Sequence, residues 1–124
     1  MRTDLQVAGD AAEERVAETL AGAGWTILGR QVHVGRAELD IVAIDPGPPA
    51  ELVVVEVRWR GRRDFGLGEE TVDWRKQARL HQAAFRWVAS TDAPRLPLRF
   101  DLVAVEPGRD GAGEPVLRHH RAAF

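Results

Sequence analysis

Two acidic residues stand in neighbouring segments whose alternating or apolar patterns are typical of β-strands. Asp40 lies in "AELDIVAI" (37–44), and Glu56 lies in "ELVVVEVRWR" (51–60) with Arg58 on the same face. If the segments pair as a hairpin, the two carboxylates lie side by side. Carboxylates that share a partly buried place repel each other and lose hydration, unless a cation joins them.

The cation that these acids would suit is a hard divalent metal. The chain has no cysteine and no clustered histidines, so oxygen ligands favour Mg²⁺ or Mn²⁺. Glu13 lies in the apolar stripe of an expected helix and is a third candidate ligand. Hydrated Mg²⁺ held by one or two carboxylates is a common device for phosphodiester chemistry. The alternative is that the acids are solvated or pair with nearby arginines.

A run of positive charge follows the second acid. Arg58, Arg60, Arg62 and Arg63 fall in "RWRGRR", in a chain whose net charge is −2. The chain has 17 basic residues, of which Lys76 is the single lysine. A basic rim beside a metal site is what a polyanionic substrate requires. The alternative is that the run forms a solvated loop.

The periodicity predicts one α/β domain in the order α-β-β-β-α-β, with three layers or two layers around one sheet. The strand at 51–60 is expected to be central, because its apolar run is nearly continuous. The segment 107–124 is either an edge strand or a loose tail, and the histidines in it, His119 and His120, are expected to be exposed and without a role. The expected elements are helices at 9–22 and 69–90 and strands at 25–34, 37–44, 51–60 and 98–106.

Length and composition place limits on the class of protein. The chain has 124 residues, of which 44% are hydrophobic and 29% charged, as expected for one globular domain over 1–124 with a core at about 9–106. The lack of cysteine excludes a disulfide scaffold, a thiolate metal site and a cysteine nucleophile. No segment has the apolar length of a membrane span or the h-region of a secretion signal, so a cytoplasmic protein is expected.

Five short motifs keep their order and spacing over roughly residues 9 to 106. Together they resemble the YraN-like family of uncharacterised proteins, which looks like a branch of the restriction-endonuclease-like superfamily, the PD-(D/E)XK nucleases, and is similar to archaeal Holliday-junction resolvases. That resemblance implies a mixed β-sheet flanked by helices. The motifs are "GDAAE" (9–13), "AELDIVA" (37–43), "VVVEVRWR" (53–60), "VDWRKQARL" (72–80) and "RFDLVAV" (99–105).

The same resemblance implies a nuclease site built from a helix Glu, an Asp and a Glu-x-Lys pair. By position these are Glu13, Asp40 and Glu56, with Arg58 at the place of the usual lysine. Ala37 also stands where the family usually has Gly. An arginine cannot act as a general base, although it can bind a phosphate with two hydrogen bonds.

Lys76 matches a lysine of the family on the second helix, so it is expected to compensate in part for Arg58. The alternative is that Lys76 lies on a solvated helix face.

The leading interpretation is therefore a Mg²⁺- or Mn²⁺-dependent endonuclease that acts on DNA, with branched DNA as a candidate substrate. Asp40, Glu56 and Glu13 would hold the metal, and Arg58 and Lys76 would contact the scissile phosphate. The outer arginines, Arg60, Arg62 and Arg63, would hold the nucleic-acid backbone further out. The resolvases that this chain resembles act as dimers, so a homodimer is an expectation too. The alternatives are a nucleic-acid-binding module of the same fold without cleavage, and a protein-interaction domain in which the acids pair with the arginines.

Overall fold

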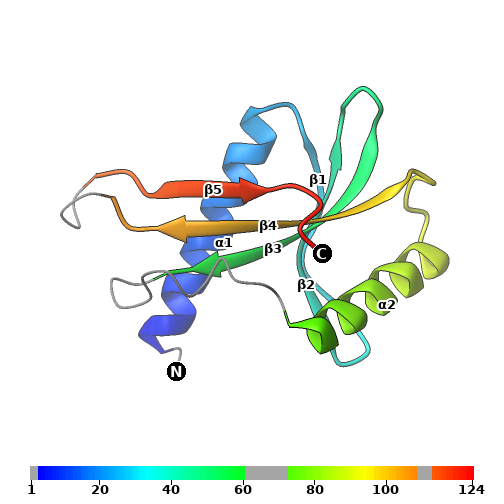
Figure 1. Ribbon diagram of the computed structural model, residues 1–124, viewed down its shortest axis with the longest axis horizontal. Coiled ribbons are helices and arrows are strands. Elements are labelled where there is room, and N and C mark those ends of the chain that lie inside the picture. The colour runs from blue at the N-terminus through cyan, green and yellow to red at the C-terminus, as the bar shows by residue number, and fades with distance from the viewer. Residues whose placement is uncertain (1–2, 61–72, 109–112) are drawn as a thin grey trace.

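The computed structural model describes residues 3–60, 73–108 and 113–124 (Figure 1). Two helices and five strands make up this part of the chain. In chain order they are α1 (Asp4–Gly22), β1 (Thr26–Val34), β2 (Ala37–Asp45), β3 (Glu51–Trp59), α2 (Trp74–Ser90), β4 (Leu98–Glu106) and β5 (Val116–His120).

The strands form one mixed sheet in the order β1-β2-β3-β4-β5. The first three strands pair antiparallel, β3 and β4 pair parallel, and β5 pairs antiparallel with β4. A parallel pair needs a crossover connection, and α2 lies within it. The predicted α/β class, the antiparallel pairing of β2 with β3 and the central place of β3 are confirmed. The last segment contains an edge strand rather than a loose tail.

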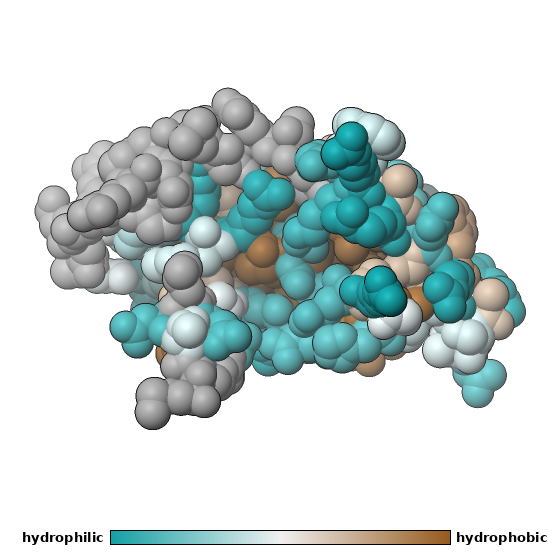
Figure 2. Space-filling view, turned by 90° about the horizontal axis from the view of Figure 1, so that it is seen from below, coloured by the Kyte–Doolittle hydropathy of each residue, from teal (hydrophilic) through white to brown (hydrophobic). Residues whose placement is uncertain are grey.

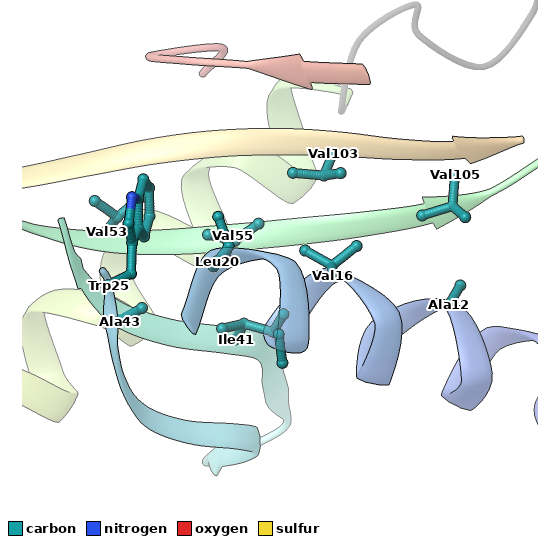
Figure 3. Packing of buried hydrophobic residues seen from close by; sticks show 11 residues of the cluster. Ala12, Val16, Leu20, Trp25, Ile41, Ala43, Val53, Val55, Val103 and Val105 are labelled. Carbon is teal, nitrogen blue, oxygen red and sulfur yellow. The ribbon is translucent and has the colours of Figure 1, made fainter. Parts of the chain in front are cut away.

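The two helices cover opposite faces of the sheet, which gives three layers. Ala12, Val16 and Leu20 of α1 pack on β2, β3 and β4 (Figure 3). Leu80 and Ala84 of α2 belong to a second cluster on the other face. Alternate residues of β3 serve the two clusters, because successive side chains of a strand point to opposite faces. Residues 53, 55, 57 and 59 face α1, and residues 52 and 54 face α2.

Helix α1 begins earlier than the sequence pattern predicts. Thr3 caps it, since the Thr3 hydroxyl accepts a hydrogen bond from the Gln6 amide and the Gln6 side chain bonds back to the Thr3 amide. This reciprocal capping satisfies two amides of the first turn. The predicted inward stripe is confirmed: its members, Ala12, Glu13, Val16, Ala17 and Leu20, are all buried.

Helix α2 begins at Trp74, where the Asp73 carboxylate accepts a hydrogen bond from the Arg75 amide at 2.7 Å. The pattern placed the helix start at residue 69, but residues 61–72 lie outside the described part of the chain. An Asp at the N-cap fits this start, because its side chain satisfies an amide of the first turn. No helix in the described ranges has the length and apolar character that crossing a bilayer requires.

A buried polar cluster ties the C-terminal end of the chain to the sheet. Asp101 of β4 is fully buried and accepts hydrogen bonds from Arg99, the His119 Nε2 atom and the Ala122 amide. Burial alone would raise the pKa of Asp101, but the bonds from His119 and Arg99 lower it to about 2. His119 is exposed, as expected, but its ring contacts Asp101, contrary to the expectation that it has no role. The cluster anchors β5.

Candidate active site

Strands β2 and β3 separate at the position of the two candidate acids. Their register runs from Asp45↔Glu51 to Ile41↔Val55 and ends there. Beyond that point the Asp40 side chain provides the hydrogen-bond acceptor for β3. Its Oδ2 atom accepts a hydrogen bond from the Val57 amide at 2.9 Å. Asp40 thus satisfies a β3 amide that the ladder leaves open. The site is a fork in the sheet, with Asp40 at its base.

The alternation of β2 also breaks at this position. Leu39 packs in the cluster on the α2 side, whereas Ile41 and Ala43 pack in the cluster on the α1 side. The neighbouring strand is irregular at the same level, since Gln31, opposite Asp40 in the β1–β2 register, has a φ of 49°. A non-glycine residue with positive φ is uncommon, and such conformations concentrate at functional sites.

Glu56 is 5% exposed and faces α2. The Nζ atom of Lys76 lies 2.6 Å from its Oε1 atom, so the single lysine of the chain neutralises the buried acid. Arg58 follows two residues later on the same face of β3 and is half-buried. The strand acid therefore has a lysine from the helix and an arginine from its own strand on one side of the sheet.

Glu13 reaches the fork from the α1 side. It is 6% exposed, and its Oε1 atom lies 3.4 Å from the Nε atom of Arg30 on β1. Sequence reasoning missed Arg30, because Gly29 and the register shift near it interrupt the alternation of β1. Burial raises the pKa of Glu13, and Arg30 opposes that effect.

An open cleft of about 450 Å³ lies on the α1 side of the fork. Glu13 and Asp40 line it, together with the exposed Glu38. Trp59 also lines the cleft, and it packs against the α1-side core. Acidic oxygens thus meet solvent on one side of the sheet, while Glu56 and Lys76 meet on the other.

The electrostatics of the fork are dominated by crowded negative charge. Burial and the nearby Glu56 carboxylate raise the pKa of Asp40 to about 8, and a side-chain hydrogen bond between the two carboxyl groups acts in the same direction. The bond from the Val57 amide opposes this rise. Of the three acids, Glu13 and Glu56 have cationic partners, whereas Asp40 has the raised pKa of a buried carboxyl group beside another acid.

The donor chemistry of the fork fits a hydrated hard cation. Within residues 3–60, 73–108 and 113–124, no three acidic or histidine side chains form a ready-made metal cage. Mg²⁺ does not need one, since it usually keeps several waters and binds one or two carboxylates. Asp40 and Glu56 are the pair in hydrogen-bonding contact, so they fit direct ligation, and Glu13 fits a contact through water.

The structure sorts the predicted basic residues into different places. Lys76 contacts Glu56 at the fork, and Arg58 follows Glu56 two positions later on β3. Arg60 is buried, and its Nη1 atom lies 3.8 Å from Glu106, so we remove Arg60 from the side chains expected to hold a nucleic-acid backbone. Arg62 and Arg63 lie outside the described residues.

Comparison with known proteins places the chain in a family. The model of the uncharacterised protein family UPF0102 matches residues 12–105. A UPF0102 protein of Symbiobacterium thermophilum is 41% identical over 103 residues, which are 83% of this chain and 85% of that protein. One from Nocardia farcinica is 36% identical over 98% of this chain and 91% of its own. One from Pseudomonas entomophila is 40% identical over 88% and 86%. The chain therefore belongs to UPF0102, the YraN-like family that its five motifs resemble.

Proposed function

We propose that this protein is a metal-dependent endonuclease that acts on DNA. The observation that carries the proposal is the contact of 2.6 Å between Lys76 and Glu56, beside the carboxyl group of Asp40. Carboxylates that can hold a divalent cation, with a side-chain cation beside them that can bind phosphate, suit metal-assisted phosphodiester hydrolysis. Here the lysine comes from α2, while the strand position of the usual lysine holds Arg58.

Each residue of the site has its own role in this proposal. Asp40 and Glu56 would hold Mg²⁺ or Mn²⁺, and Glu13 would support the hydrated ion through water. The bound metal supplies Lewis-acid polarisation of the scissile phosphate and lowers the pKa of a bound water. Lys76 donates hydrogen bonds to the phosphate or to the attacking water. Arg58 stabilises the charge that develops on the phosphate oxygens, since its guanidinium can donate two parallel bonds.

A second candidate function is nucleic-acid binding without cleavage, because Glu56 already has a cationic partner in Lys76. A lysine at 2.6 Å neutralises the acid without a metal, which suits a domain that binds nucleic acid and does not cut it. Branched DNA remains a candidate substrate for either function, and a homodimer would present two sites to it.

The test is gel cleavage of labelled duplex and four-way DNA in Mg²⁺, in Mn²⁺ and in chelator. If the protein is a nuclease, we expect the wild type to cut DNA in Mg²⁺ or Mn²⁺ but not in chelator, and Glu56→Gln to cut in none of these conditions. Glu56→Gln keeps the size of the side chain and a hydrogen-bond acceptor for Lys76, so it is a matched blank. Equal products from the wild type and Glu56→Gln would exclude the site. Binding of both DNAs without cleavage would favour the binding module.

A further inference from the structure

A row of arginines runs along the exposed side of α2. Arg75, Arg79 and Arg86 are all exposed, and at 3.6 residues per turn they fall within about 40° around the helix axis. From residue 75 to residue 86, at about 1.5 Å of rise per residue, the row is about 16 Å long. Helix α2 (Trp74–Ser90) contains no Asp or Glu, so nothing within the helix offsets this charge.

These arginines differ from most others in the described part of the chain. Arg15, Arg30, Arg99, Arg118 and Arg121 each contact a carboxylate. Within the described ranges, Arg79 and Arg86 have no ion pair, and the guanidinium of Arg75 lies over the ring of its neighbour Trp74 at 5.1 Å. An unmatched row is what a polyanion needs.

The row has a defined relation to the candidate active site. Lys76, which contacts Glu56, precedes Arg79 by three positions, so the two side chains are neighbours on the helix surface. At the other end, a Cβ placed on Gly35 would lie 3.4 Å from the Nη1 atom of Arg86. Arg86 is thus beside the turn between β1 and β2, which adds the exposed Arg36.

The side of the molecule on which α2 lies is largely hydrophilic, with small hydrophobic areas between (Figure 2). We propose that this row, Arg75, Arg79 and Arg86 with Arg36 at its end, binds the phosphodiester backbone of a nucleic-acid strand that leaves the active site along α2. The inference rests on the proposed function for the identity of the substrate. A length of about 16 Å matches roughly five nucleotide steps at 3.4 Å each. The contacts carry no sequence information, because phosphate contacts position a strand without reading bases.

The experiment compares Arg79→Gln/Arg86→Gln with a matched control, Arg15→Gln/Arg121→Gln. Both double variants remove two positive charges from partly or fully exposed arginines, and the control arginines already pair with Glu114 and Asp45. Binding of labelled duplex and four-way DNA is measured in chelator over a range of salt. For the α2 variant we expect the slope of log K against log salt to fall by about two, and affinity at 0.1 M salt to fall roughly 50-fold. The control should keep the wild-type slope.

A second readout locates the strand on the protein. Trp74 is 71% exposed at the start of the row, so bound DNA should protect its fluorescence from acrylamide, and Trp74→Phe should abolish that protection. An unchanged salt slope in the α2 variant, or equal losses of affinity in the α2 and control variants, would overturn the proposal that the row binds DNA. The cleavage assay separates the two proposals. If DNA binds along α2 but is never cut, the proposed role of the row stands and the nuclease proposal fails. If DNA is cut in a metal-dependent way and both variants keep the wild-type slope, the nuclease proposal stands and the proposed role of the row fails.

Discussion

The ammonium of Lys76 lies 2.6 Å from the carboxylate of Glu56, although the residues are 20 positions apart and on different elements. Glu56 is buried, while the Lys76 side chain is 39% exposed. Solvent can therefore receive the lysine when it leaves, whereas the buried carboxylate then needs another cation in its place. This asymmetry allows one residue to neutralise the site at rest and to contact a phosphate when substrate is present.

The first prediction concerns Lys76→Met, which keeps most of the stem and removes the charge. We expect cleavage to fall about a hundredfold, as for the loss of one donor to a developing anion. The free energy of unfolding should fall by about 1 kcal/mol, a modest loss because the lysine is partly exposed. Affinity for Mn²⁺, measured by calorimetry, should rise because a competing cation is gone.

The control for this prediction is the double variant Lys76→Met/Glu56→Gln. If the two residues interact, its stability loss should be smaller than the sum of the two single losses. Additive losses of stability, together with unchanged Mn²⁺ affinity in Lys76→Met, would show that the contact between Lys76 and Glu56 contributes nothing to stability or to the site.

The second prediction follows from the raised pKa of Asp40. Between its ordinary value of 3.8 and about 8, the folded protein holds a proton that the unfolded chain releases. Asp40 therefore lowers stability progressively as pH rises through this window, by about 1.4 kcal/mol per pH unit at most. Its effect is absent below pH 4 and constant above pH 8. Asp40→Asn should unfold at a higher temperature than the wild type at pH 8, and the difference should vanish near pH 4.

Asn is the suitable replacement, because its side-chain oxygen can still accept the bond from the Val57 amide. Added Mn²⁺ should stabilise the wild type and leave Asp40→Asn unaffected. A stability difference that is the same at pH 4 and pH 8 would place its origin outside the ionisation of this carboxyl group.

The third prediction concerns the buried cluster around Asp101. Asp101→Asn leaves the charge of Arg99 partly uncompensated, so stability should fall by about 3 kcal/mol or more. The wild-type contribution is present above pH 4 and is lost as pH falls towards about 2, since the pKa of Asp101 is lowered to that value. Acid unfolding followed by circular dichroism measures both effects. His119→Gln is the milder control, because it removes one bond to Asp101 and leaves Arg99 in place.

The pattern of the sequence predicts the elements well where burial sets the period. The inward stripe of α1 and the alternation of β3 are confirmed, because each face of the sheet has its own core. The same reasoning brought Asp40 and Glu56 together. It could not show the fork, since the break in β2 between Leu39 and Ile41 depends on tertiary packing that a period-two pattern does not record.

The partners of the acids were harder to predict than the acids themselves. Arg30 meets Glu13 across 17 positions, and Arg99 meets Glu51 across 48, so spacing along the chain carries no signal for either pair. Arg60 was expected at the surface because it belongs to a run of arginines. In the structure it is buried beside Glu106, a residue of β4 that only the parallel pairing of β3 with β4 brings near.

The last prediction asks whether the helix lysine replaces the strand lysine. Arg58 follows Glu56 on β3, at the position where the superfamily that the chain resembles has lysine, and arginine keeps its proton at any ordinary pH. In the Lys76→Met background, Arg58→Lys should restore metal-dependent cleavage about tenfold, which corresponds to about 1.4 kcal/mol of barrier. In the wild-type background the same change should matter less, because Lys76 already reaches Glu56. Single-turnover cleavage at saturating DNA measures both effects without a contribution from binding. If Arg58→Lys raises the rate equally in both backgrounds, the two positions act independently, and Lys76 does not stand in for the strand lysine.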